Sequence, residues 1–165
     1  MAASSLIVSL LNQAATHQFG NLLGRLLPAG SLILLSGDLG SGKTTLVQGL
    51  GSGLGISDPI VSPTFILLNE YFEGRVPLYH FDLYRLEPMA VAALQIEAYW
   101  EGVEYPPGIV AIEWSERLDQ KPPAYLEILL TPLDPEGRQA CLTAVGNFPQ
   151  EIFDQIKNAF ANEGV

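Results

Sequence analysis

Cysteine, basic residues and long hydrophobic runs are all scarce in this chain of 165 residues. A single cysteine, Cys141, excludes an internal disulfide and a thiolate cluster for a structural metal, and we expect it to be a small buried residue in a strand. The longest apolar runs, such as residues 32–35 and 109–112, fall far short of the roughly 18 residues that predict a membrane-spanning helix. The N-terminus also lacks the basic start of a secretory signal, so we expect a cytoplasmic protein without a membrane anchor.

The shortage of basic residues limits the partners of this protein. Only 8 Lys and Arg stand against 18 Asp and Glu, for a formal net charge of −10. Nucleic-acid binding usually needs a basic face that displaces counterions from phosphates, so we do not expect this chain to hold RNA or DNA unaided. A polyanion can still bind at one local site, if aligned backbone N–H groups and a metal ion overcome the global field.

Apolar residues make up 48% of the chain, which is enough for a core, and the length suits one domain spanning residues 1–165. Helical spacing predicts helices over residues 13–27, 43–54, 88–100 and 149–160. Apolar runs bounded by turn residues predict strands over 31–36, 65–72, 76–83, 109–113, 125–131 and 139–145. This order predicts an α/β fold, in which helices cover a sheet that has antiparallel additions.

Three alternating glycines, Gly49, Gly51 and Gly53, weaken the predicted helix over 43–54. We interpret them as a sign of close packing or of an early helix end, in preference to a second ligand loop.

The clearest motif is a phosphate-binding loop. Residues 37–44 read GDLGSGKT and match G-x-x-x-x-G-K-[ST] at every position, after an apolar strand and before a helix. Glycines let consecutive N–H groups turn inward, and the helix N-terminus adds partial positive charge. We expect Lys43 to reach the β and γ phosphates of ATP, and the Thr44 hydroxyl to hold Mg²⁺. The candidate nucleotide-binding residues are Asp38, Leu39, Gly40, Ser41, Gly42, Lys43, Thr44 and Thr45.

Such a loop needs an acidic side chain for the metal, usually at the end of a neighbouring buried strand. Glu113 directly follows four apolar residues, and we interpret it as a metal ligand or water-orienting group. Asp82 closes a second apolar run and is a candidate for the active site. Either carboxylate could instead be a structural partner, for example of Arg85.

Two neighbouring features leave alternatives open. His80, in a strand beside aromatic residues, could be catalytic, but we favour a packing role. Residues 62–65 lie where nucleotide-binding proteins often carry a switch loop, and Thr64 offers a hydroxyl to Mg²⁺ or the γ-phosphate; a plain turn fits nearly as well.

Taken together, residues 37–45, 62–65, 79–86 and 112–114 resemble the bacterial TsaE (YjeE) family, over about residues 16–145. The resemblance implies an α/β P-loop NTPase-like three-layer sandwich, whose mixed sheet has a parallel core and antiparallel additions. It also implies slow ATP hydrolysis inside the complex that forms threonylcarbamoyladenosine in tRNA. The partners it implies are the two other proteins of that complex, of the TsaB and TsaD type, with tRNA bound only indirectly.

The resemblance also implies roles for individual residues. Lys43 and Thr44 would serve phosphate and Mg²⁺, Glu113 would be the second magnesium-associated acid, and Asp82 would be needed for turnover. Three further positions would lie near the nucleotide or the site: Thr16, Arg138 and Trp114.

Two residues depart from the family's pattern, Ser115 where a proline usually follows the tryptophan, and Gln95 where glycine is common. Both lie outside the phosphate site, so they concern the shape of local loops.

The leading hypothesis is therefore a Mg²⁺-dependent ATPase with catalytic residues Lys43, Asp82 and Glu113. A small-molecule P-loop kinase is an alternative, but the few scattered basic residues offer no arginine cluster for a cationic lid. The second alternative is a nucleotide-gated interaction module in which hydrolysis is incidental.

Overall fold

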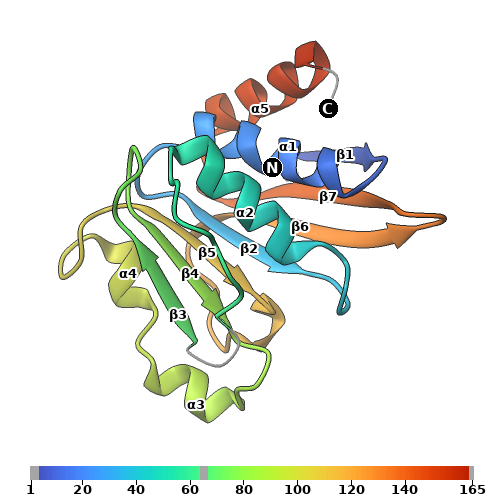
Figure 1. Ribbon diagram of the computed structural model, residues 1–165. Helices are drawn as coiled ribbons and strands as arrows, with labels where there is room; N and C mark the ends of the chain where they lie inside the picture. The colour runs from blue at the N-terminus through green and yellow to red at the C-terminus, as the bar shows by residue number, and fades with distance from the viewer. Residues whose placement is uncertain (1–3, 64–66, 164–165) are drawn as a thin grey trace.

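The computed structural model describes residues 4–63 and 67–163, which form one seven-stranded sheet with helices on both faces (Figure 1). The strands are β1 (Ser5–Leu10), β2 (Leu32–Ser36), β3 (Leu68–Tyr71), β4 (Leu78–Asp82), β5 (Ile109–Glu113), β6 (Ala124–Leu133) and β7 (Gly137–Gly146). The helices are α1 (Gln13–Leu26), α2 (Lys43–Leu54), α3 (Pro88–Ala93), α4 (Glu97–Glu101) and α5 (Gln150–Glu163), with a short 3₁₀ turn at Ser115–Arg117.

The sheet is mixed, as predicted. Its strand order is β1-β7-β6-β2-β5-β4-β3, and the four strands from β6 to β4 run parallel to one another. β1, β7 and β3 are antiparallel additions at its two ends. β4 and β5 are buried along their whole length, which explains why both read as continuous runs of mostly apolar residues.

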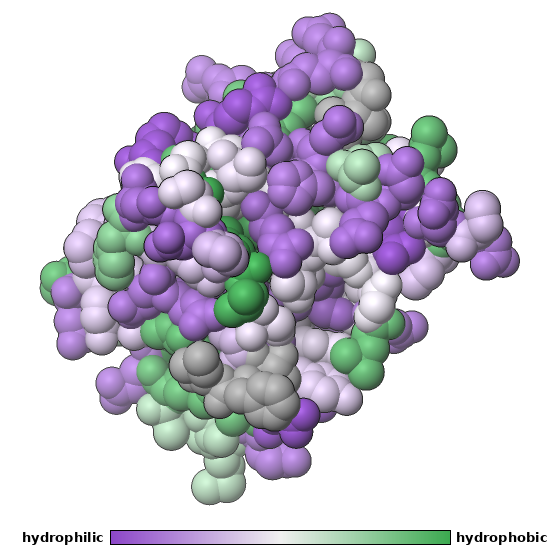
Figure 2. Space-filling view, in the orientation of Figure 1, coloured by the Kyte–Doolittle hydropathy of each residue, from purple (hydrophilic) through white to green (hydrophobic). Residues whose placement is uncertain are grey.

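Helices cover the two faces unequally. On one face, α1, α2 and α5 pack over Ile33 and Leu35 of β2; on the other, α3 and α4 pack over Leu32 and Leu34. This arrangement confirms the three layers. On the face shown in Figure 2, hydrophobic residues form small separate groups among hydrophilic ones. Within residues 4–63 and 67–163, every helix is too short or too polar to traverse a bilayer.

The helices α3 and α4 do not extend over β1, β7 and the end of β6 on their face of the sheet. Ile7, Cys141 and Leu129 lie side by side in these three strands. Ile7 is 64% exposed and Leu129 is 45% exposed. The expectation of a buried cysteine was therefore wrong: Cys141 lies in a strand, but it is only half-buried because the described helices do not cover this part of the sheet.

The helix predicted over residues 88–100 is broken into α3 and α4. Gln95, between them, has φ 51°, in the left-handed region that a helix cannot contain. The chain therefore keeps the turn for which glycine is suited, although this sequence has glutamine there.

We expect the Gln95→Gly variant to be more stable than the parent by about 0.5–1 kcal/mol, because glycine adopts this φ without steric cost and the exposed side chain adds little. Urea unfolding measures the difference. Gln120→Gly, at an exposed position outside the helices and strands, controls for a general effect of glycine and should be neutral or destabilising. A loss of stability in Gln95→Gly would show that the left-handed conformation costs this residue nothing.

Close packing explains the glycines of α2, as we interpreted them. A Cβ atom on Gly49 would lie 2.0 Å from the His17 carbonyl oxygen of α1, and one on Gly53 would lie 2.2 Å from the Asn21 carbonyl oxygen. The backbones of α1 and α2 therefore approach closely, which fixes α2, and the loop that precedes it, against the rest of the fold. At the start of α1, the side chain of Asn12 caps the helix by accepting a hydrogen bond from the Ala15 N–H.

Gly49→Ala should lower the free energy of unfolding by about 1–3 kcal/mol, since the new methyl group meets backbone that cannot move alone. Gly51→Ala is the matched control: its Cβ would meet side-chain atoms and no backbone, first the Ile60 Cδ1 atom at 1.9 Å, which is the end of a flexible side chain. Because alanine favours a helix over glycine by about 1 kcal/mol, the free energy of unfolding of the control should stay close to that of the parent. Equal losses at both positions in urea unfolding would contradict the packing explanation.

Candidate functional site

The site residues predicted from sequence lie together at the carboxyl ends of the parallel strands. β2, β4 and β5 are parallel neighbours, and their register pairs Leu35 with Glu113 and Asp82 with Glu113. The carboxyl ends of these strands therefore meet beside the N-terminus of α2. A cavity of about 500 Å³ opens there, lined by Gln13, Leu39, Gly40, Ser41, Gly42, Lys43, Thr44, Thr45, Ser62, Asp82, Tyr84, Arg85, Glu113, Trp114 and Arg138.

The loop over residues 37–42 connects β2 to α2 and has the shape of an anion cradle. Gly42 precedes α2 with φ 103°, which a residue with a Cβ atom rarely adopts. A Cβ atom added at Gly42 would also lie 3.3 Å from Arg138 Nε. The open backbone and the helix N-terminus together leave room and N–H groups for a phosphate.

Lys43 is buried and turned into its own loop. Its ammonium Nζ donates to the carbonyl oxygens of Gly37 at 2.5 Å and Asp38 at 3.0 Å, and lies 4.1 Å from the centre of the Trp114 ring. Burial lowers the pKa of Lys43 below its ordinary value, against the opposing effect of nearby carboxylates, Glu113 first. A bound phosphate can therefore accept hydrogen bonds from the ammonium in place of these carbonyl groups.

Trp114 immediately follows β5 and has φ 60°, an uncommon conformation for a bulky residue. Its ring packs against Tyr84, with ring centres 4.8 Å apart. The next residue, Ser115, donates its hydroxyl to the Leu35 carbonyl oxygen at 3.1 Å. Ser115 thus joins the ends of β5 and β2 at the position where proline was expected.

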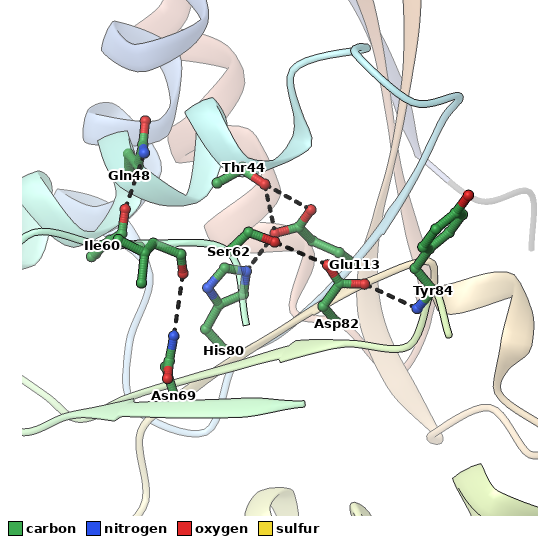
Figure 3. A network of polar contacts seen from close by, with 10 residues as sticks. Thr44, Gln48, Ile60, Ser62, Asn69, His80, Asp82, Tyr84 and Glu113 are labelled. Carbon is green, nitrogen blue, oxygen red and sulfur yellow. Dashed lines mark hydrogen bonds and ion pairs between the residues drawn. The ribbon is translucent and has the colours of Figure 1, made fainter. Parts of the chain in front are cut away.

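Thr44 and the two candidate carboxylates form a polar network (Figure 3). The Thr44 hydroxyl lies 3.0 Å and 3.1 Å from the two oxygens of Glu113. Asp82 accepts hydrogen bonds from the Ser62 hydroxyl at 3.1 Å and the Tyr84 N–H at 2.9 Å. Both carboxylates are almost fully buried. The structure thus brings Lys43, Thr44, Asp82 and Glu113 to one cavity.

Three consecutive residues after α2 are held by hydrogen bonds, and the third of them bonds to the site. Gln48 of α2 donates to the Ile60 carbonyl oxygen, Asn69 of β3 donates to that of Val61, and Ser62 bonds to Asp82 (Figure 3). Thr64, the other hydroxyl considered for Mg²⁺, lies outside the described residues.

Arg138 reaches the phosphate loop from β7. Its guanidinium donates to the Gly40 carbonyl oxygen at 3.1 Å and to that of Gly137 at 2.9 Å. Among residues 4–63 and 67–163, its buried Nε–H finds no acceptor. Thr16 is buried below the loop, donates its hydroxyl to the Asn12 carbonyl oxygen, and does not line the cavity. Asp38 contributes its backbone carbonyl and is likewise absent from the lining.

Sequence reasoning missed some of the lining. Tyr84 and Arg85 follow Asp82 at the end of β4, so chain proximity could have indicated them. Gln13 begins α1, far from any motif, and no local signal marks it. Arg85 and Arg138 are distant in the chain, yet both line the cavity with Lys43. Basic residues that are scattered in sequence are thus gathered in space.

The residues present suit a nucleotide with Mg²⁺. A glycine cradle, an ammonium and a buried guanidinium N–H that has no acceptor among the described residues fit a polyphosphate. A threonine hydroxyl 3.0 Å from a carboxylate is a hard-oxygen pair of the kind that Mg²⁺ uses beside phosphate oxygens.

Comparison with known proteins identifies similar chains. Residues 10–140 match the model of the family described as threonylcarbamoyl adenosine biosynthesis protein TsaE. A Nostoc sp. strain PCC 7120 protein named tRNA threonylcarbamoyladenosine biosynthesis protein TsaE is 62% identical over 82% of this chain and 84% of its own length. The Bacillus subtilis protein of the same name is 35% identical over 88% and 90%.

A solved structure agrees with these sequence matches. The crystal structure of Bacillus subtilis YdiB superimposes with a TM-score of 0.80 and 29% identity, and covers 96% of this chain and 98% of its own. The likeness extends over nearly the whole mixed sheet and its helices.

Proposed function

Because the chain belongs to the TsaE family, we propose that it is a Mg²⁺-dependent ATPase that acts in the formation of threonylcarbamoyladenosine in tRNA. One observation carries the proposal: an ammonium, a hydroxyl and a carboxylate converge on a glycine loop at the N-terminus of α2. These groups belong to Lys43, Thr44 and Glu113. We regard residues 1–165 as a single ATPase domain.

Each residue has a task in the proposed hydrolysis. Backbone N–H groups of residues 38–45 bind the phosphates, and the Lys43 ammonium leaves the Gly37 carbonyl group to balance charge that develops on the γ-phosphate. Thr44 and Glu113 would hold Mg²⁺, which neutralises charge on the phosphate oxygens when it is bound. Glu113 or Asp82 orients the attacking water for in-line displacement.

Partners follow from the charge of the chain and from its family. Because the chain has a net charge of −10, it is poorly suited to bind tRNA itself. We propose that the two other proteins of the complex, of the TsaB and TsaD type, hold the tRNA. The same partners would complete the site, so that the protein alone hydrolyses ATP slowly. A cytoplasmic location fits this role.

ATP turnover by the purified protein, measured with and without the partner pair, tests the proposal. We expect slow Mg²⁺-dependent release of phosphate from the protein alone and faster release with the partners. No binding of ATP at millimolar concentration would contradict a nucleotide site. If ATP assembles the complex and hydrolysis is dispensable for tRNA modification, the protein is a nucleotide-gated module; transfer of phosphate to a small-molecule acceptor would identify a kinase.

A further inference from the structure

His80 lies directly beneath the candidate metal site. It belongs to β4, where Leu78 contributes to the core under α1 and α2, whereas Tyr79 and Phe81 belong to the core of the opposite face. Because side chains alternate along a strand, His80 and Asp82 point to the same face as Leu78. The imidazole is fully buried, and its Nε2 lies 2.5 Å from Glu113 Oε2 (Figure 3).

We propose that His80 is a positioning residue that orients the Glu113 carboxylate for the metal and for Thr44. The inference rests on the proposed function, since it assigns a role at the same site. In this role the Nε2–H group donates to Oε2 of Glu113, and both carboxylate oxygens remain within 3.1 Å of the Thr44 hydroxyl. A metal ligand is commonly held by such an outer hydrogen bond.

The surroundings of His80 determine where its proton is. Among the described residues, Nδ1 of His80 is buried and has no hydrogen-bond partner. A proton on Nδ1 would be a buried donor without an acceptor, which costs more free energy than a lone pair left unused. The tautomer with its proton on Nε2 is therefore favoured, and it is the one that can donate to Glu113.

Glu113 needs such a donor. Its side chain rotates about three bonds, and the Thr44 hydroxyl carries only one hydrogen to share between two oxygens. The nearby Lys43 ammonium is directed instead to the carbonyl groups of its own loop. With Thr44 assigned to the metal, His80 is the group that keeps the carboxylate in place throughout.

A packing role for His80, which the sequence alone favoured, makes a different prediction. Packing requires only volume, so a leucine of similar size should serve as well as the imidazole. Positioning requires an N–H at the place of Nε2, and the side-chain amide of glutamine can provide one. His80→Leu and His80→Gln therefore separate the two roles.

The test measures ATP binding by calorimetry, in EDTA and over a series of Mg²⁺ concentrations, together with kcat and KM for hydrolysis. For His80→Leu we expect the half-saturating Mg²⁺ concentration to rise about tenfold or more, while ATP binding in EDTA stays unchanged. His80→Gln should restore most of the Mg²⁺ response. His17→Gln, the same change at the other histidine, should behave as the parent.

Each outcome decides between the roles. An unchanged Mg²⁺ response in His80→Leu, or equal defects in folded His80→Leu and His80→Gln, would overturn the positioning role. If the parent itself shows no Mg²⁺-dependent ATP binding, the proposed function fails instead. Should both variants fail to fold, ¹⁵N NMR of the parent ring, assigned with His17→Gln, decides: a proton on Nε2 supports the inference, and a ring whose only proton is on Nδ1 overturns it.

Discussion

Lys43→Ala should reduce ATP hydrolysis by about 100- to 1000-fold, the range for removing one preorganised charge-stabilising group. It should also weaken ATP binding, because it removes a buried positive charge that lies against the phosphate loop. Phosphate release under saturating Mg²⁺ and calorimetric titration with ATP measure the two effects.

The pH dependence of binding provides a second readout for the same residue. Burial lowers the pKa of Lys43 below 10.5, so its ammonium is lost at a lower pH than that of an ordinary lysine. ATP affinity of the parent should therefore fall as pH rises through this lowered pKa, and Lys43→Ala should lack this fall.

Lys157→Ala is the matched control for Lys43→Ala. Lys157 is an exposed residue of α5, so its removal changes the net charge equally and leaves the cavity intact. It should hydrolyse ATP as the parent does. If Lys43→Ala bound and hydrolysed ATP as well as the parent, the assignment of the phosphate loop would be wrong.

Glu113→Gln should reduce hydrolysis by about 100-fold or more while preserving the shape of the site. The amide removes the negative charge that Thr44 and Mg²⁺ would share, and it places a donor or a weaker acceptor opposite His80. ATP binding in EDTA should persist, since the loop amides and Lys43 are unchanged. The increase in ATP affinity on adding Mg²⁺ should be lost.

Glu116→Gln controls for the change in charge, because this exposed glutamate lies only three residues away on the 3₁₀ turn. Asp82→Asn then assigns the water-orienting group. If it lowers kcat without altering the Mg²⁺ requirement, Asp82 orients the water and Glu113 serves the metal. In the reconstituted complex, Glu113→Gln should still assemble with the partner proteins but fail to sustain tRNA modification; normal modification would contradict the role of hydrolysis.

Local patterns were sufficient for the elements that surround the phosphate loop. The predicted bounds of α2 and β5 agree with the structure, and β2 differs by one residue. These elements are set by interactions between near neighbours in the chain: apolar runs, glycine turns and a helix start. The motif over residues 37–44 likewise depends on contiguous residues, so its shape could be anticipated.

Other features depend on residues that are distant in the chain. His80 meets Glu113 because β4 lies parallel to β5. Arg138 contacts the phosphate loop because β7 pairs antiparallel with β6, which places the start of β7 near that loop. The exposure of Cys141 depends on which strands the helices leave uncovered. No local pattern encodes these arrangements.

The amino-acid order alone therefore determined the phosphate loop, the acids that end two buried strands and the type of most elements, because neighbouring residues decide them. Tertiary structure decided which groups meet: that Glu113 lies between Thr44 and His80, and that Lys43 lies under Trp114. Strand order and helix packing bring these side chains together, and both result from burying apolar surface across the whole chain.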